Sequence, residues 1–325
     1  MQSSASKNRT VVRSRNTIRL TRAALQTAYV VSEDLGTSLA ERLFTTPRRH
    51  TRPDRERAVL ASARPLSIDV TLRAPRWHGS MLRLAAWQWG HGPTVLLVHG
   101  WEGRGSQLGS FVEPLVAAGM SVVAFDAPGH GDSPDHRLYL TDLADCIADV
   151  AAALGPIHAL VAHSFGAAAV LLAHRRGHIA AARNVMISPN VLIDDAVRRF
   201  AHLVGLDDHD RSALEQRLAD QTGVGIADLA LDRLAADRDD GLLVIHDRDD
   251  REVAFEHGAR LAAIWPKAQL RETAGLGHRK ILRDADVLAA TVDFVRLGAP
   301  APVSDLVREV DRWLDAADHP DGSAS

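Results

Sequence analysis

Short apolar runs, separated by helix-like segments, recur from the middle of the chain toward its carboxyl-terminal part. The runs that we predict as strands are 94–99, 121–126, 158–162, 185–187, 242–246 and 269–273. Between several of them apolar residues recur at helical spacing, as at 107–118 and 141–154. Because apolar strands that alternate with helices are typical of a parallel sheet covered on both faces, the pattern predicts an α/β fold with a mostly parallel, doubly wound sheet.

The amino-terminal part of the chain follows a different pattern. Segments 67–72 and 81–87 alternate between apolar and polar residues, which predicts two antiparallel strands. Apolar residues at broadly helical spacing in 17–44 predict one or two helices that dock on the main domain, with a charged connector at 50–65. Residues 1–16 are basic and rich in Ser and Thr, and we expect a disordered arm there rather than a transit peptide of similar composition.

A long segment without any strand pattern separates two of the predicted strands, and its apolar spacing predicts three short helices at about 192–204, 210–220 and 226–236. Ligands of open parallel sheets bind outside the carboxyl ends of the strands, so we expect this insertion to lie there as a helical lid. The residues of the insertion that we expect to contact a substrate are Val191, Leu192 and Phe200.

These patterns together predict the domain organisation. We expect a basic arm and helical extension at 1–64, an α/β core at 65–190 and 241–298, the lid at 191–240, and a linker with a carboxyl-terminal amphipathic helix at 299–325. The last helix is expected at about 305–316, where apolar residues again recur at helical spacing.

Composition and charge narrow the class of protein. The chain has 325 residues, of which 46% are hydrophobic and 24% charged, as in an ordinary soluble globular protein. Its net charge of −3 gives no sign of nucleic-acid binding. No apolar run approaches the roughly 18 residues that cross a bilayer, so we expect a cytoplasmic protein without a membrane partner. Composition does not reveal the oligomeric state.

Cysteine, histidine and glycine patterns argue against a metal or another cofactor. Cys146 is the only cysteine, which excludes a disulfide within the chain and a cysteine-based metal site. His174 and His178 lie four residues apart on a predicted helix, but no third ligand is evident. The glycine-rich loop after the first apolar strand has Leu108 where a dinucleotide fingerprint needs its last glycine. We therefore expect no cofactor and no metal.

The most informative stretch is Ala162-His163-Ser164-Phe165-Gly166, where a predicted strand turns directly into an alanine-rich helix. A side chain presented by so sharp a turn strains its own backbone, and the close approach of strand and helix leaves room only for small flanking residues. The Ser164 hydroxyl then stands at the positive amino-terminal end of a helix, where developing negative charge is favoured. An ordinary helix cap at Ser164 explains this stretch equally well, so the rest of the chain must decide.

Two later segments supply a base and an acid that such a serine nucleophile needs. His278 follows the strand predicted at 269–273, and three carboxylates, Asp247, Asp249 and Asp250, follow the strand at 242–246. Because the carboxyl ends of parallel strands meet at one edge of the sheet, we expect these side chains near Ser164. The residues by themselves leave the choice among the three carboxylates open.

With its order Ser, Asp, His, the segment 67–298 resembles the α/β-hydrolase family, and in particular serine esterases and lipases with a helical lid. The family's strand-end His-Gly corresponds to His99-Gly100, and its post-strand turn corresponds to 126–133. The family's nucleophile turn corresponds to 162–166, where Ala162 stands in place of the usual glycine.

The resemblance implies which residues act. The family's acid segment aligns with 246–253 and places its acid at Asp250, so the implied catalytic triad is Ser164, Asp250 and His278. The backbone N–H groups of Trp101 and Phe165 are the implied oxyanion hole. The Trp101 side chain is expected to line the substrate pocket.

The expected activity is hydrolysis of a small-molecule carboxylic ester through an acyl-enzyme intermediate. Thioesterase, lactonase, amidase and perhydrolase activities use the same triad and remain alternatives. A non-catalytic relative that binds a ligand beneath the lid is the alternative of a different class. Epoxide hydrolases and haloalkane dehalogenases use an Asp nucleophile, and Ser164 argues against them.

Overall fold

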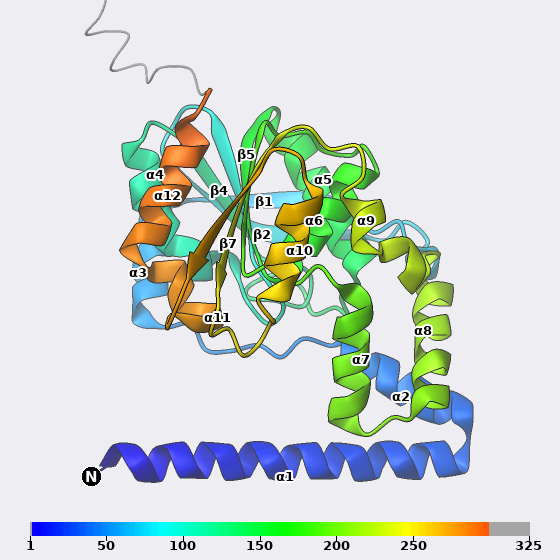
Figure 1. Ribbon diagram of the computed structural model, residues 1–325. Helices are drawn as coiled ribbons and strands as arrows, with labels where there is room; N and C mark the ends of the chain where they lie inside the picture. Colours follow the sequence, from blue (N-terminus) through cyan, green and yellow to red (C-terminus); the bar gives the residue numbers. More distant parts are fainter. Residues whose placement is uncertain (1, 299–325) are drawn as a thin grey trace, which may run out of the picture.

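A sheet of eight strands forms the centre of the protein, and the computed structural model describes residues 2–298 (Figure 1). The strands are β1 (Arg64–Thr71), β2 (Met81–Trp89), β3 (Thr94–Val98), β4 (Ser121–Phe125), β5 (Ile157–His163), β6 (Arg183–Ile187), β7 (Gly241–Asp247) and β8 (Ala268–Thr273). Their order across the sheet is β1-β2-β4-β3-β5-β6-β7-β8. Strands β3 to β8 run parallel, and β1 and β2 are antiparallel to their neighbours at one edge. The predicted α/β fold with a mostly parallel sheet is confirmed.

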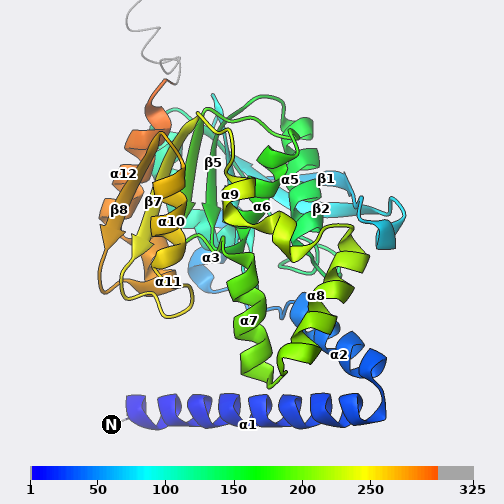
Figure 2. The ribbon, with the colours of Figure 1, turned by 45° about the vertical axis from the view of Figure 1, so that its right-hand side comes forward.

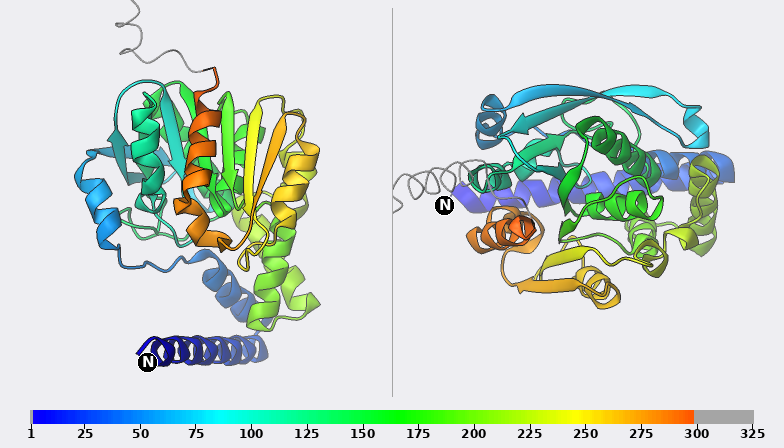
Figure 3. Two further views of the ribbon diagram at one scale, coloured as in Figure 1. Left: turned by 60° about the vertical axis from the view of Figure 1, so that its left-hand side comes forward. Right: turned by 90° about the horizontal axis from the view of Figure 1, so that it is seen from above.

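Helices cover both faces of this sheet (Figure 3). One face packs against α3 (Asp54–Ala61), α4 (Val112–Ala117) and α12 (Ala285–Arg296), and the other against α5 (Leu140–Leu154), α6 (Phe165–Arg175) and α10 (Glu256–Ile264). Consecutive residues of a strand point to opposite faces of the sheet. Leu96 of β3 packs in the hydrophobic cluster on one face, and Leu97 packs in the cluster on the other face. Both are fully buried, which explains why the strand is apolar at every position.

The chain leaves the sheet after β6 and forms helices before it returns as β7. These inserted helices are α7 (Ile193–Val204), α8 (Asp208–Thr222) and, after a short 3-10 turn at Ile226–Leu229, α9 (Leu231–Leu234). Gly205 ends α7 and Gly223 ends α8, both in the left-handed backbone region that glycine adopts without a steric cost. Figure 2 shows α7 and α8 projecting away from the sheet. The three predicted helical segments are observed, although the third is interrupted.

Two further helices precede the sheet, α1 (Gln2–Val31) and α2 (Glu33–Thr45). The Ser32 hydroxyl caps α2 by accepting a hydrogen bond from the Leu35 N–H at 3.1 Å. Because α1 begins at Gln2, the prediction of a disordered arm at 1–16 was wrong. Once residues further along a helix are held by packing, its extension by one more residue costs little, and sequence polarity alone does not reveal this. The predicted connector at 50–65 also contains a helix, α3.

The amino-terminal helices pack against the inserted helices rather than against the sheet. A hydrophobic cluster joins α1, α2, α7 and α8 through Leu25, Ala40, Val197, Val204 and Leu214. Figures 1 and 2 show α1 lying across the ends of α7 and α2 that are farthest from the sheet. Segments that are distant in sequence therefore form one helical layer beside the carboxyl edge of the sheet.

Within residues 2–298, no helix combines the length and the apolar character that crossing a bilayer requires. The carboxyl-terminal helix predicted at 305–316 lies outside the described residues.

A buried ion cluster centred on Glu41 of α2 ties the helical layer to the rest of the protein. The Glu41 carboxylate is 2.6 Å from Arg217 Nε of α8 and 3.0 Å from Arg76 Nη1, which precedes β2. It also contacts Arg137 at 3.3 Å and accepts a hydrogen bond from the Tyr139 hydroxyl. Because one acid serves three arginines, its loss would leave Arg76 and Arg137 without this ion-pair partner and Arg217 with Asp34 alone among the described ion pairs.

We expect Glu41→Ala to lower the free energy of unfolding by about 3 kcal/mol, because removing one partner of a buried ion pair leaves the other charge uncompensated. Denaturant unfolding of the purified protein measures this change. Asp69→Ala is the matched control, because Asp69 pairs with Arg83 on the surface and this substitution should change stability little. Equal stability of the two variants would contradict the central role of Glu41.

Asp142 of α5 lies beneath this cluster and is fully buried. Its Oδ2 accepts hydrogen bonds from Trp77 Nε1 at 3.0 Å and from the Tyr139 N–H at 3.2 Å. Burial raises the pKa of Asp142 from 3.8 to about 7, because removing water disfavours the ionised form.

This pKa predicts a pH dependence of stability. Between the ordinary pKa of 3.8 and about 7, folded Asp142 holds a proton that the unfolded chain releases. The stability that Asp142 contributes is therefore present at low pH and is lost as pH rises through this window. Relative to Asp142→Asn, the wild-type protein should lose up to about 1.4 kcal/mol of stability per pH unit there. Thermal unfolding of both proteins across the window checks this, and a pH-independent difference would contradict it.

Candidate active site

Ser164 stands at a strained turn between β5 and α6. Its backbone angles are φ 54° and ψ −122°, a conformation that few residues other than glycine adopt. A Cβ at Gly166 would lie 2.5 Å from the His99 carbonyl oxygen, and a Cβ at Gly100 would lie 2.8 Å from the Ser164 Cβ. Both glycines therefore allow the loop after β3 to approach the serine closely. Ala162, which stands where the family usually has glycine, is buried without disturbing the turn.

His278 and Asp250 complete a line of hydrogen bonds that begins at Ser164. His278 belongs to α11 (Gly277–Lys280), which follows β8, and Asp250 lies in the loop after β7. The distance from Ser164 Oγ to His278 Nε2 is 3.0 Å, and His278 Nδ1 is 2.7 Å from Asp250 Oδ2. This arrangement fits the imidazole tautomer with its proton on Nδ1, so that Nε2 accepts from the serine hydroxyl.

The surroundings of Asp250 keep its carboxylate ionised and fixed in orientation. Its Oδ1 accepts backbone hydrogen bonds from Glu252 at 2.8 Å and from Val253 at 3.0 Å, which leaves Oδ2 for His278. A second buried histidine, His246, places Nε2 3.6 Å from the same Oδ2. Burial acts to raise the pKa of Asp250, but the nearby His246 ring and the hydrogen bond with His278 outweigh it and hold the pKa well below its usual range.

The other two carboxylates of this segment point elsewhere. Asp247 accepts hydrogen bonds from the Thr273 hydroxyl at 2.7 Å and from the Leu276 N–H at 3.0 Å. Asp249 accepts from the Gly275 N–H at 2.9 Å. Both acids therefore brace the loop that carries His278 rather than contact its imidazole. The structure brings Ser164, His278 and Asp250 together, as the sequence predicted.

His163, the residue before Ser164, contacts His278 through a hydrogen bond and through its ring. Its Nε2 donates to the His278 carbonyl oxygen at 3.1 Å, and the two rings lie 4.6 Å apart between centroids. Burial and the neighbouring imidazole of His278 hold the pKa of His163 well below its usual value. A neutral His163 can thus donate to the backbone of His278 without adding charge beside it.

The loop that carries Trp101 is held by two neutral histidines. His99 Nε2 accepts a hydrogen bond from the Ala127 N–H, and His130 Nε2 accepts one from the Glu102 N–H, each at 3.0 Å. Burial lowers the pKa of His99 to about 3 and that of His130 to about 4, so both rings keep an acceptor nitrogen. Glu102 has a positive φ of 54°, and its N–H is committed to His130. Trp101 directly precedes this strained residue.

The segment between α2 and α3 also forms ion pairs with this loop. The Glu102 carboxylate lies 2.9 Å from Arg48 Nε and 3.1 Å from His50 Nε2. Burial acts to raise the pKa of Glu102, but the hydrogen bonds with Arg48 and His50 prevail and lower it. Sequence reasoning missed these two residues, because the pattern of a charged connector does not show which charges it pairs with.

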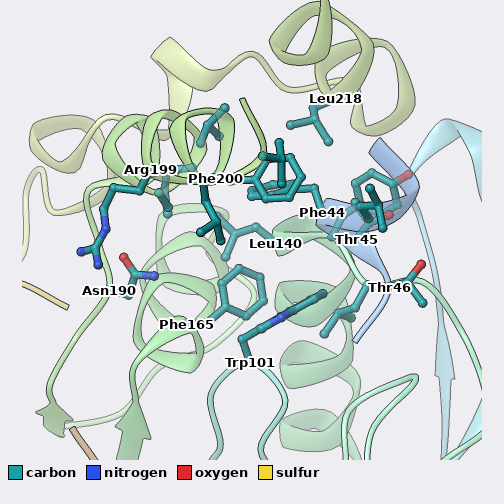
Figure 4. Close-up of a pocket in the computed structure, with 18 of the residues that line it drawn as sticks. Phe44, Thr45, Thr46, Trp101, Leu140, Phe165, Asn190, Arg199, Phe200 and Leu218 are labelled. Atoms are coloured by element: carbon teal, nitrogen blue, oxygen red, sulfur yellow. The ribbon is translucent and has the colours of Figure 1, made fainter. Parts of the chain in front are cut away.

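A cavity of about 830 Å³ reaches Phe165, the residue after Ser164, although Ser164 itself is not among the lining residues (Figure 4). Trp101 and Phe165 line it, and their rings meet edge to face at 5.8 Å between centroids. Phe200 of α7, which the sequence analysis expects to contact a substrate, also lines the cavity. Val191 and Leu192 do not line it, and this part of the prediction was wrong: Val191 is fully buried in the main hydrophobic core, and Leu192 packs against that core.

The opposite wall of the cavity comes from the amino-terminal helices. Ile18 and Thr21 of α1 and Leu39, Leu43 and Phe44 of α2 line it. The sequence analysis did not predict these residues as part of the site. One feature of the sequence could have indicated this wall. Apolar residues of α2 occur on more than one face of the helix, and docking on the main domain would bury only one of these faces.

Among the side chains that the structure describes, those of residues 17–298, no three or more His, Cys, Asp or Glu converge as a candidate metal site.

Comparisons with known proteins agree with this fold. Residues 95–291 match the model of a family described as the alpha/beta hydrolase family. A nucleophile at a strand-to-helix turn, followed in the chain by an acid and a histidine at the same sheet edge, is the arrangement typical of this class. The chain belongs to the α/β hydrolase family.

Solved structures resemble the chain at low sequence identity. An esterase from Thermogutta terrifontis is 20% identical with a TM-score of 0.53, over 73% of this chain and 100% of that one. An esterase from Rhodococcus sp. ECU1013 is also 20% identical, with a TM-score of 0.52 over 74% of this chain and 100% of that one. A bromoperoxidase from Bacillus anthracis is 16% identical, with a TM-score of 0.52 over 71% of this chain and 100% of that one. No curated protein sequence matches the chain.

Proposed function

We propose that this protein is a serine hydrolase that cleaves carboxylic esters through an acyl-enzyme intermediate. The observation that carries the proposal is the line of hydrogen bonds from Ser164 through His278 to Asp250, with distances of 3.0 and 2.7 Å, at a strained turn beside a cavity. Membership of the α/β hydrolase family and likeness in fold to two esterases support it. The proposed catalytic triad is Ser164, His278 and Asp250.

In the first half of the proposed reaction, Ser164 Oγ attacks the ester carbonyl carbon while His278 Nε2 takes its proton. The Trp101 and Phe165 N–H groups stabilise the resulting oxyanion, and the Phe165 amide has no partner within its helix because it begins α6. His278 then gives the proton to the alcohol oxygen as the C–O bond breaks, and the acyl group remains on Ser164.

In the second half, a water molecule attacks the acyl-enzyme while His278 again takes a proton. Collapse of the second tetrahedral intermediate releases the carboxylic acid and returns the proton to Ser164 Oγ. Asp250 stabilises the imidazolium form of His278 in both halves and holds the ring in one tautomer. The inserted helices α7–α9 act as a lid that limits access of water to this centre.

Labelling with a fluorophosphonate probe tests the proposal, because the probe reacts with a serine that a histidine activates. We expect one modified residue, Ser164, identified by mass spectrometry of the digested protein. A panel of p-nitrophenyl esters, thioesters and anilides then measures which bond is cleaved fastest, and we expect esters to be preferred. A folded protein that neither reacts with the probe nor cleaves any member of the panel would refute the proposed function.

A further inference from the structure

The cavity beside Ser164 is far larger than a small acyl group requires. Its volume of about 830 Å³ lies in the upper part of the range, roughly 300–1,000 Å³, that holds drug-sized ligands. The side chains that face it are mostly aliphatic or aromatic, and they include Ile18, Leu43, Phe44, Phe200, Leu203 and Leu218. Such a wall favours a ligand that is itself long and apolar.

The acidic residues at the cavity are already neutralised by basic neighbours. Glu102 pairs with Arg48 at 2.9 Å, Asp195 pairs with Arg198 at 2.9 Å, and Glu252 pairs with Arg279 at 3.0 Å. Two exposed arginines, Arg42 and Arg199, provide further charge among the lining residues. Each carboxylate among the lining residues thus already has a basic partner, which makes the cavity a poorer site for a cationic substrate than for an uncharged one.

Trp101 and Phe165, whose N–H groups form the proposed oxyanion hole, mark the reactive end of the cavity. Figure 4 shows Trp101 and Phe165 at one end, with Phe44, Phe200 and Leu140 beyond them. The carbonyl of an ester held by the Trp101 and Phe165 amides would thus direct one of its two substituents between these apolar side chains.

The far wall of the cavity is held in place by contacts between helices that are remote in sequence. The rings of Phe44 on α2 and Phe200 on α7 lie 5.0 Å apart between centroids. Arg217 Nε of α8 is 2.6 Å from the buried Glu41 of α2. The amino-terminal helices and the inserted helices therefore enclose the space together, and neither group forms it alone.

From these observations we infer that the substrate is an ester with a long aliphatic chain, and that α1 and α2 form the wall that selects its length. This inference rests on the proposed function of Ser164 and adds the substrate class. Each methylene buried in the cavity should raise kcat/KM about fourfold until the space is filled. The chain lies on the acyl or on the alcohol side of the ester, and both fit the same cavity.

Two ester series test the inference. The p-nitrophenyl esters of acetate, butyrate, octanoate and dodecanoate place the chain on the acyl side, and acetates of ethanol, butanol, octanol and dodecanol place it on the alcohol side. We expect kcat/KM to rise steeply with chain length in at least one series. Acetyl or butyryl esters as the best substrates, with no gain from longer chains in either series, would overturn the inference.

Substitutions that reduce the size of the cavity test the role of the helical wall. Leu43 of α2 and Leu203 of α7 line the cavity and are 39% and 48% exposed, so tryptophan at either position fits without cutting into the core. Leu43→Trp and Leu203→Trp should each lower the ratio of kcat/KM for the longest ester to kcat/KM for the butyryl ester at least tenfold. Leu35→Trp is the matched control on α2, because Leu35 is 48% exposed and does not line the cavity.

A direct binding measurement separates this inference from the proposed function. Dodecanoate should raise the thermal midpoint of Ser164→Ala, which retains the cavity but not the nucleophile, and Leu43→Trp in the same background should remove the shift. If the wild-type protein reacts with the fluorophosphonate but Ser164→Ala shows no shift with dodecanoate and neither ester series depends on chain length, the inference fails while the proposed function stands. Dodecanoate binding without any reaction at Ser164 would instead refute the proposed function.

Discussion

Ser164→Ala should lower kcat for ester hydrolysis by about 10⁶-fold, the loss that removal of a serine nucleophile causes in serine proteases. Alanine occupies the space of the serine without its Oγ, so His278 Nε2 loses the hydroxyl that lies 3.0 Å away. The turn itself should survive, because the small residues that shape it, Gly166 and Gly100, are unchanged. Steady-state kinetics with the best p-nitrophenyl ester measures the loss.

The control for this prediction is the fold of the variant. The circular dichroism spectrum and the thermal midpoint of Ser164→Ala should stay close to those of the wild-type protein, because the hydroxyl contributes little to packing. Retention of more than a few per cent of the wild-type kcat in a preparation free of contaminating esterase would show that another residue is the nucleophile.

Asp250→Asn should lower kcat by about 10⁴-fold, as the corresponding change does in the serine proteases. An asparagine presents either an amide donor or a neutral oxygen to His278 Nδ1. The donor favours the wrong tautomer, and the neutral oxygen no longer stabilises the imidazolium that forms during the reaction. The backbone hydrogen bonds from Glu252 and Val253 to Oδ1 should preserve the position of the side chain.

The neighbouring acids provide matched controls of the same chemical change. Asp249→Asn should leave kcat nearly unchanged, because Asp249 accepts a hydrogen bond only from the Gly275 N–H among the described contacts. Asp247→Asn should act on stability, by about 1–3 kcal/mol, because an amide group would face the donors of Thr273 and Leu276 inside the protein. If Asp247→Asn abolished turnover in a protein of unchanged stability, Asp250 would not be the acid of the triad.

Residues that precede the sheet also hold parts of the site in place. Arg48 and His50 hold Glu102, next to the proposed oxyanion residue Trp101, and Glu41 holds the inserted helix α8 through Arg217. The amino-terminal part of the chain thus contacts the loop that carries Trp101 and forms one wall of the cavity. In this protein it is part of the site rather than an appendage to the α/β core.

Much of the core and of the reactive centre followed from the sequence, for local physical reasons. A strand buried on both faces must be apolar at consecutive positions, so β3, β4 and β7 were recognisable from short windows. The turn at Ser164 demands small neighbours within two residues, which also leaves a local signature. Because parallel strands end at one edge, the order of the segments placed His278 and the acid loop near Ser164 before any distance was known.

The tertiary structure decided what depends on contacts between distant segments. It selected Asp250 over Asp247 and Asp249, because the path of one loop determines which carboxylate faces the imidazole. It also decided that Val191 belongs to the core, and that α1 and α2 close the cavity. Glu41 and Arg217 are 176 positions apart, and no periodicity of either helix encodes their pairing, because helical spacing reports that a face is buried but not what buries it.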